Sequence, residues 1–132
     1  MKKFSLQTSS RTDFIKMDRQ IAEAIAEMGL TEGVATIFIP HTTAGITINE
    51  NADPDVTADM ELVLDRVVPW SGGYRHFEGN TAAHVKASMM GSSAQVIVSG
   101  GRPQLGTWQS IYFCEFDGPR TRQVWVKGLS EQ

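Results

Sequence analysis

Val34-Ala35-Thr36-Ile37-Phe38-Ile39, closed by Pro40, gives the clearest strand signal in the chain. Its residues are almost all β-branched or aromatic, and proline ends the run because it cannot continue a strand ladder. Residues 44–49 are expected to form a partner strand. Outward from this pair, similar patterns predict five more strands, at residues 3–8, 13–16, 94–99, 107–116 and 122–127.

Three helices are expected between these strands, each running from a capping residue to a stop signal. They run from Asp18 to Gly29, from Asp53 to Pro69 and from Asn80 to Gly91. The second start is the best defined, because a capping oxygen on Asp53 precedes Pro54 at the first helical position. Strands and helices do not alternate regularly, so the sequence predicts an α+β fold: a mainly antiparallel β-sheet or sandwich with two to three helices.

Length and composition describe one ordinary globular domain, spanning residues 1–132. The chain is 41% hydrophobic and 20% charged, and a domain of this size can fold without disulfides. The lone Cys114 cannot form an intramolecular disulfide, which suits a reducing compartment. Because Cys114 lies among apolar residues, we expect a packed thiol and not a nucleophile.

Charge and hydropathy argue against two classes of partner. A net charge of −3 disfavours binding to a nucleic-acid backbone. No run approaches eighteen apolar residues, so no membrane span is expected. The start Met1-Lys2-Lys3 lacks the apolar core of a signal peptide, and a cytoplasmic location is expected.

All three histidines fall in loops or near element ends. His41 follows a strand, His76 lies in a glycine-flanked loop, and His84 lies one helical turn beyond Asn80, on the same face. If the three converge, they could ligate Zn²⁺ with an open fourth position or transfer protons. Each could equally make ordinary hydrogen bonds in a loop.

Carboxylates gather around the start of the second helix. Asp55 and Asp59 are four residues apart, with Glu50 and Asp53 just before them. They could complement the helix dipole, which is the simpler interpretation of Asp55. Together they could instead hold Mg²⁺, which prefers carboxylate and water ligands plus a substrate phosphate.

Two arginines flank a predicted turn, Asp117-Gly118-Pro119. Arg120 and Arg122 could bind a carboxylate or phosphate in bidentate fashion, or pair with Glu115 or Asp117. Trp108 is expected in the core or at a subunit interface. The glycine-rich residues 99–106 are expected to form a long turn, because they lack the lysine and helix of a phosphate-binding loop.

Three ordered motifs together resemble the YjbQ family over essentially the whole chain. The first runs from His41-Thr42-Thr43-Ala44-Gly45-Ile46-Thr47-Ile48-Asn49-Glu50 to Asp53-Pro54-Asp55-Val56 and Asp59. The second is His76-Phe77-Glu78-Gly79-Asn80-Thr81-Ala82-Ala83-His84. The third joins Leu105-Gly106-Thr107-Trp108-Gln109 to Glu115-Phe116-Asp117-Gly118-Pro119-Arg120-Thr121-Arg122.

This resemblance implies a compact α+β domain that assembles as a homotrimer. It also implies a secondary thiamine-phosphate synthase activity, which joins hydroxymethylpyrimidine pyrophosphate to thiazole phosphate and releases pyrophosphate. The family's candidate site maps onto six residues: His41, His76, His84, Asn80, Glu50 and Asp59.

The leading hypothesis is therefore a transferase that acts on phosphorylated small molecules. Catalytic roles are expected for His84, His41, His76, Asp59 and Glu50, and substrate contacts for Asn80, Arg120, Arg122 and Gln109. Mg²⁺ would accompany the pyrophosphate, and no organic cofactor is expected. The alternatives are a hydrolase with Zn²⁺ on His41, His76 and His84, and a non-catalytic trimer that binds a small anionic metabolite.

Overall fold

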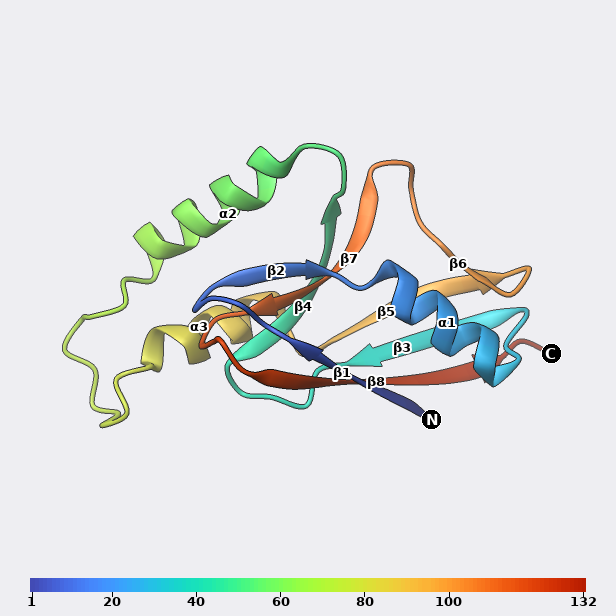
Figure 1. Cartoon of the computed structure of the whole chain (residues 1–132), viewed down its shortest axis with the longest axis horizontal. Coiled ribbons are helices and arrows are strands. Elements are labelled where there is room, and N and C mark those ends of the chain that lie inside the picture. Colours follow the sequence, from blue (N-terminus) through green and yellow to red (C-terminus); the bar gives the residue numbers. More distant parts are fainter.

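The computed structural model describes all 132 residues and contains eight strands and three helices (Figure 1). In chain order the elements are β1 (Lys2–Gln7), β2 (Asp13–Lys16), α1 (Asp18–Met28), β3 (Gly33–Phe38), β4 (Ala44–Glu50), α2 (Pro54–Val67), α3 (Thr81–Met90), β5 (Ser93–Ser99), β6 (Arg102–Gln104), β7 (Gln109–Glu115) and β8 (Thr121–Ser130).

The strands form two sheets in which every pairing is antiparallel. A five-stranded sheet has the order β1-β8-β3-β5-β6, and a three-stranded sheet has the order β2-β7-β4. The predicted α+β class, with a mainly antiparallel sheet or sandwich and up to three helices, is confirmed.

The main core lies between the two sheets and is closed by α1. Ile21 and Ile25 of α1 are fully buried against Ile37 of β3, Phe113 of β7 and Val126 of β8. These side chains follow the helical and alternating periods from which the elements were predicted.

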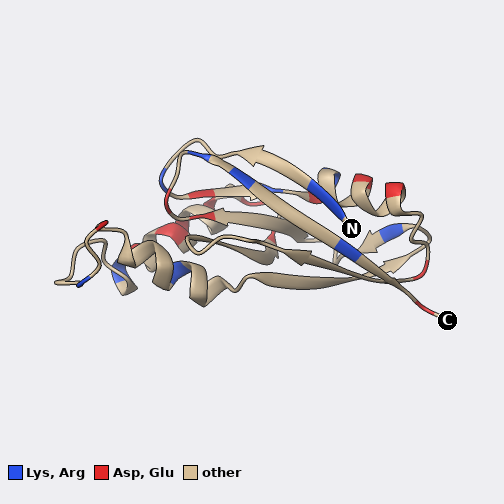
Figure 2. Ribbon diagram, turned by 90° about the horizontal axis from the view of Figure 1, so that it is seen from below, with Lys and Arg blue, Asp and Glu red and all other residues tan.

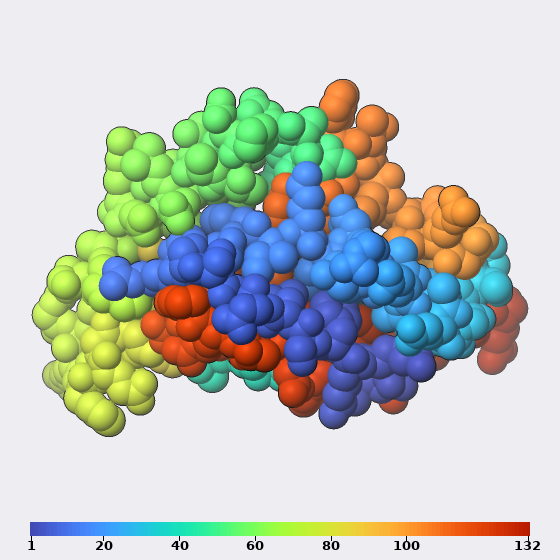
Figure 3. Space-filling view, in the orientation of Figure 1, coloured from blue at the N-terminus to red at the C-terminus, as the bar shows by residue number.

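The second helix packs more loosely than the first. Only Leu64 of α2 is buried, while Leu62, Val63 and Val67 are at least half exposed. In the space-filling view α2 lies along the margin of the molecule, and the 70–80 loop lies at one end (Figure 3). The predicted start of α2 is confirmed, because the Asp53 carboxylate accepts a hydrogen bond from the Asp55 N–H at 2.9 Å.

Two predicted capping side chains bind tertiary partners instead of helix ends. Met17 is the N-cap of α1, and the Asp18 carboxylate instead accepts hydrogen bonds from Ser110 Oγ and the Ile111 N–H of β7. Asn80 is the N-cap residue of α3, as predicted, but its side chain makes no capping hydrogen bond, and its Nδ2 donates to Asp117 Oδ2 at 2.8 Å.

The C-terminal half differs from the prediction in three places. The expected turn over residues 99–106 contains β6, because Arg102 and Gln104 pair with Ser99 and Ile97 of β5. Trp108 precedes β7 and its surface is 64% exposed, so the core option for this residue is wrong. β8 continues to Ser130, since it pairs with β3 along that length.

Charges of both signs are spread along the whole ribbon (Figure 2). No helix is long and apolar enough to cross a membrane.

Candidate functional site

One polar pocket lies where the β3–β4 connection meets the start of β8. It has a volume of about 610 Å³, within the range of small-molecule sites. We call it the arginine pocket. It is lined by Phe38, Ile39, Pro40, His41, Thr42, Thr43, Ser92, Arg120 and Arg122.

A second polar pocket, which we call the helix pocket, adjoins the first. It has a volume of about 490 Å³ and is lined by His41, Thr42, Ala44, His84, Ala87, Ser88, Gly91 and Ser92. The two pockets share three residues: His41, Thr42 and Ser92. The structure therefore brings His41 and His84 together, although residues 42–83, which include α2, separate them in the sequence.

The wall of the arginine pocket contains a buried ion pair. Arg122 donates from Nε and Nη2 to the two carboxylate oxygens of Glu115, and from Nη2 to Thr43 Oγ1 at 2.8 Å. Burial alone would raise the pKa of Glu115, but hydrogen bonds from Arg122, the Asp117 N–H and Thr8 hold this pKa below its usual value. The ion-pair alternative for Arg122 is thus realised, while Nη1 makes no hydrogen bond within the protein.

Arg120 is held more loosely at the mouth of the same pocket. Its Nε donates to the Asp117 carbonyl at 2.9 Å, and its Nη2 contacts Asp117 Oδ2 at 3.2 Å. Half of its side-chain surface is exposed. An exposed pair of this kind exchanges partners at little cost, so Arg120 can turn toward an anion.

His41 is fixed in one neutral tautomer. Its Nε2 accepts a hydrogen bond from the Gln123 N–H at 2.9 Å. Burial, and next the charge of Arg122, lower the pKa of His41 below its ordinary value. A neutral imidazole that accepts at Nε2 carries its proton on Nδ1, so His41 offers one N–H donor.

The third histidine lies beside the second but lines neither pocket. The rings of His76 and His84 meet edge to face with centroids 5.5 Å apart. No group of three His, Cys, Asp or Glu side chains is placed to hold a metal ion, and the Gln123 N–H occupies His41 Nε2. The zinc site predicted on His41, His76 and His84 stays a prediction, and the zinc content of the purified protein would test it directly.

Glu50 and Gln109 lie in the three-stranded sheet, at the end that is remote from the two polar pockets. They face each other in the β4–β7 ladder, whose other end pairs Ala44 with Glu115. Six residues of strand place them roughly 20 Å from the pockets. Glu50 Oε2 accepts the N–H groups of Ala52 and Asp53 at 3.0 and 3.3 Å, and Gln109 Oε1 accepts that of Gly106 at 2.8 Å. Both side chains therefore hold turns in this chain and are not brought to His41.

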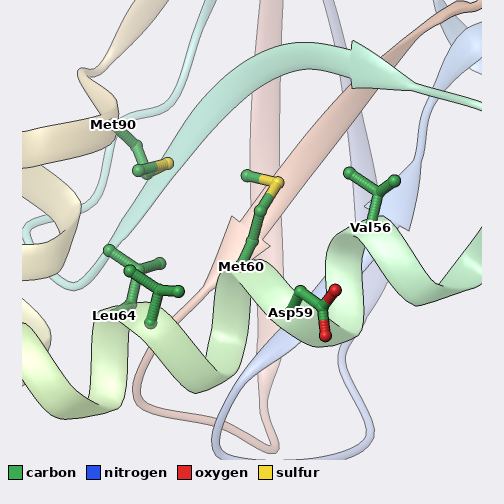
Figure 4. A pocket seen from close by; sticks show the side chains of 6 residues that line it. Val56, Asp59, Met60, Leu64 and Met90 are labelled. Carbon is green, nitrogen blue, oxygen red and sulfur yellow. The ribbon is translucent and has the colours of Figure 1, made fainter.

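Asp59 belongs to an apolar groove between α2 and α3. The groove measures about 430 Å³, and Asp59 is its one charged residue (Figure 4). Its other lining residues are Val56, Met60, Val63, Leu64 and Met90. The structure does not place Asp59 in either polar pocket.

Asn80 links α3 to the arginine pocket without lining it. Its Nδ2 and Arg120 Nη2 donate to the same oxygen of Asp117. The Oδ1 of Asn80 is buried and has no hydrogen-bond partner. Asn80 and Arg120 are therefore linked in this chain through the carboxylate of Asp117.

The sequence analysis missed two hydroxyl groups, those of Ser88 and Ser92. Ser88 follows His84 by four residues on α3, so helical spacing alone would have placed both on one face. Ser92 reaches the pockets only through the fold, from the turn before β5.

These observations define an antiparallel α+β domain with a histidine- and arginine-lined site at one end of its sheets. The model of the family described as "UPF0047 protein YjbQ-like" matches residues 2–131. The chain belongs to this family, which confirms the resemblance seen in its motifs.

Individual relatives match over nearly their full length. The UPF0047 protein YugU of Bacillus subtilis is 55% identical over 96% of this chain and 97% of its own. A UPF0047 protein of Methanocaldococcus jannaschii is 45% identical over 98% of this chain and 94% of its own. A crystal structure of a YjbQ/UPF0047 family protein from Clostridium acetobutylicum shares 55% identity and a TM-score of 0.95, covering 98% of this chain and 100% of that one.

Proposed function

We propose that the protein is an enzyme that acts on phosphorylated small molecules, with the condensation that yields thiamine phosphate as a secondary activity. The observation that carries this proposal is the arginine pocket. Arg120, Arg122, Thr42 and Ser92 line one concave surface. Guanidinium and hydroxyl donors together suit a phosphoryl group.

The chemistry needs donors at the leaving group more than it needs a base. The thiazole nitrogen uses its lone pair to bond the pyrimidine methylene carbon, and the carbon–oxygen bond to pyrophosphate breaks. Pyrophosphate leaves with that electron pair, and the nitrogen becomes the thiazolium cation, so no proton has to be removed. Arg120 and the Nδ1–H of His41 would stabilise the charge that develops on the leaving oxygen.

The local charge balance indicates how pyrophosphate would arrive. Glu115 neutralises Arg122 and Asp117 faces Arg120, so the pocket has donors but little net positive charge. A highly charged anion is therefore expected as its Mg²⁺ complex, with the ion carried by the substrate. The carboxylates at the start of α2, which could hold Mg²⁺ by their chemistry, do not line the pocket.

The test is to incubate the purified protein with hydroxymethylpyrimidine pyrophosphate, thiazole phosphate and Mg²⁺, and to detect thiamine phosphate after oxidation to its fluorescent thiochrome. We expect turnover that falls at least tenfold in Arg120→Gln, because a charge-assisted hydrogen bond contributes about 1.5–3 kcal/mol. Arg102→Gln is the matched control, since Arg102 is exposed on β6 and lines neither pocket.

A non-catalytic binder of an anionic metabolite is the second candidate. It is favoured by one observation: most donors of Arg120 and Arg122 already have protein partners, as in a recognition site. Thermal stabilisation by pyrophosphate without any thiamine phosphate would support this function and reject the first.

A further inference from the structure

We propose that His41 divides the site into two compartments: the arginine pocket binds the phosphoryl group, and the helix pocket binds the uncharged heterocycle of the same substrate. This inference rests on the proposed function and goes further, because it assigns each half of the substrate to particular side chains.

The two pockets differ in the hydrogen-bond donors that line them, although they share a wall. Both guanidinium groups of the site line the arginine pocket, whereas no Lys, Arg, Asp or Glu lines the helix pocket. A phosphoryl group placed in the helix pocket would find no cation. The arginine pocket, in contrast, is lined by both Arg120 and Arg122.

The helix pocket has a lining suited to a flat ring. Ala44, Ala87 and Gly91 contribute little side-chain volume, so planar apolar contact is possible there. Gly45 lets α3 approach this closely, because a β-carbon at that position would lie 2.7 Å from the Gly91 carbonyl oxygen. His84, Ser88 and Ser92 surround this surface with polar groups, as ring nitrogens and an amino group require. The Ser88 hydroxyl donates to the His84 carbonyl at 3.0 Å, so its oxygen is left as an acceptor.

His41 lies at the boundary because it lines both compartments, together with Thr42 and Ser92. The Gln123 N–H holds its imidazole from the β8 side, which leaves Nδ1–H as the donor. The bond that joins the heterocycle to its pyrophosphate would therefore lie next to His41, with one group on either side.

The test measures binding of each half separately by titration calorimetry. The ligands are Mg²⁺-pyrophosphate and the unphosphorylated hydroxymethylpyrimidine. Ser88→Phe fills the helix pocket from an exposed position, so folding should be unaffected. Met89→Phe is the control, because it adds a comparable ring at an exposed neighbouring residue that does not line the helix pocket. Arg120→Gln and its control Arg102→Gln probe the other compartment.

We expect Ser88→Phe to raise the dissociation constant of the pyrimidine at least tenfold and that of pyrophosphate less than twofold. Arg120→Gln should do the reverse, and neither control should change either constant more than twofold. Equal weakening of both ligands by either variant, or no binding of the pyrimidine to the unmodified protein, would overturn the division.

Failure of this inference is distinguishable from failure of the proposed function. If thiamine phosphate forms and Ser88→Phe leaves the KM for the pyrimidine substrate unchanged, the division is rejected and the function stands. If no thiamine phosphate forms but the two ligands respond separately as expected, the division stands as a property of a binding protein.

Discussion

Arg122 shows how one side chain can line a site and also support the fold. Its side chain is 4% exposed, and its partner Glu115 is fully buried. Removing one member of a buried pair leaves the other as an unpaired charge in a poorly hydrated environment. From the sequence alone, Arg122 could contact a ligand or form an ion pair. The choice depends on whether the fold brings Glu115 of β7 against Arg122 of β8, which lies in the other sheet.

We predict that Arg122→Met lowers the free energy of unfolding by about 3–5 kcal/mol, measured by urea denaturation. The double variant Glu115→Gln/Arg122→Met removes the residual charge and should be more stable than the single variant. A loss below about 1 kcal/mol for Arg122→Met would contradict a buried, paired guanidinium.

The lowered pKa of His41 predicts a loss of stability in mild acid. Its folded pKa is lowered from 6.5, so the unfolded chain binds more protons once the pH falls below about that value. Stability from this group is complete above pH 6.5 and declines as the pH drops toward the folded pKa. Glu115, with a pKa lowered from 4.5, adds a further loss only in stronger acid.

The variant His41→Gln should separate this effect, because glutamine retains an acceptor for the Gln123 N–H but does not titrate. We expect the Tm of the unmodified protein to fall more than that of His41→Gln between pH 7 and pH 5. Parallel pH profiles for the two proteins would show that His41 is not held neutral by the fold.

At the scale of elements, the contact between α3 and β4 determines the shape of the helix pocket. The Ile46 N–H donates to the Gly91 carbonyl at 3.0 Å, and Gly45 leaves room for this approach. An added methyl group would meet backbone atoms, which cannot rotate away.

We therefore predict that Gly45→Ala costs about 1–3 kcal/mol of stability by overpacking. The same variant should weaken binding of the pyrimidine, since α3 has to move outward. Gly106→Ala is the control, because its nearest contact is the flexible end of Gln109 at 3.2 Å. Equal urea midpoints for the two variants would contradict the close packing.

Helices and strands that are long enough to show a period could be predicted from the sequence. Periodic patterns located all three helices and seven of the eight strands, because burial on one face imposes these periods. β6 was missed, since a three-residue strand is too short to show a period. The side chains of Asp18 and Asn80 were misassigned because their partners lie 92 and 37 residues away.

The candidate site was predictable in part for the same reason. Residues at the β3–β4 end and on α3 do converge, as the placement of polar residues at element ends suggested. Glu50, Gln109 and Asp59 belong to the same family motifs but lie elsewhere in the chain. Motif membership does not report distance, which only the strand register provides.

At the scale of the whole molecule, the predicted assembly into a homotrimer is still to be tested. The α2 face exposes Leu62, Val63 and Val67, and Trp108 is exposed beyond β4. A homotrimer would cover part of this apolar surface. We expect light scattering to give three times the 14.5 kDa mass of the chain.

Val63→Lys should reduce that mass toward one chain, because it places a charge on the α2 face. Gln95→Lys adds the same charge at an exposed position of β5 and should leave the mass unchanged. A mass of one chain for the unmodified protein would contradict the trimer.

The position of β8 has a consequence for how the protein is made. This strand follows all the others along the chain, yet it lies between β1 and β3 and carries Arg122. During translation the ribosome releases β1 and β3 well before their common neighbour exists. Until β8 has emerged, the edges of β1 and β3 that face it stay open, and until Arg122 has emerged Glu115 has no counter-ion. Neither the fold nor the pocket can therefore be completed before synthesis reaches that strand.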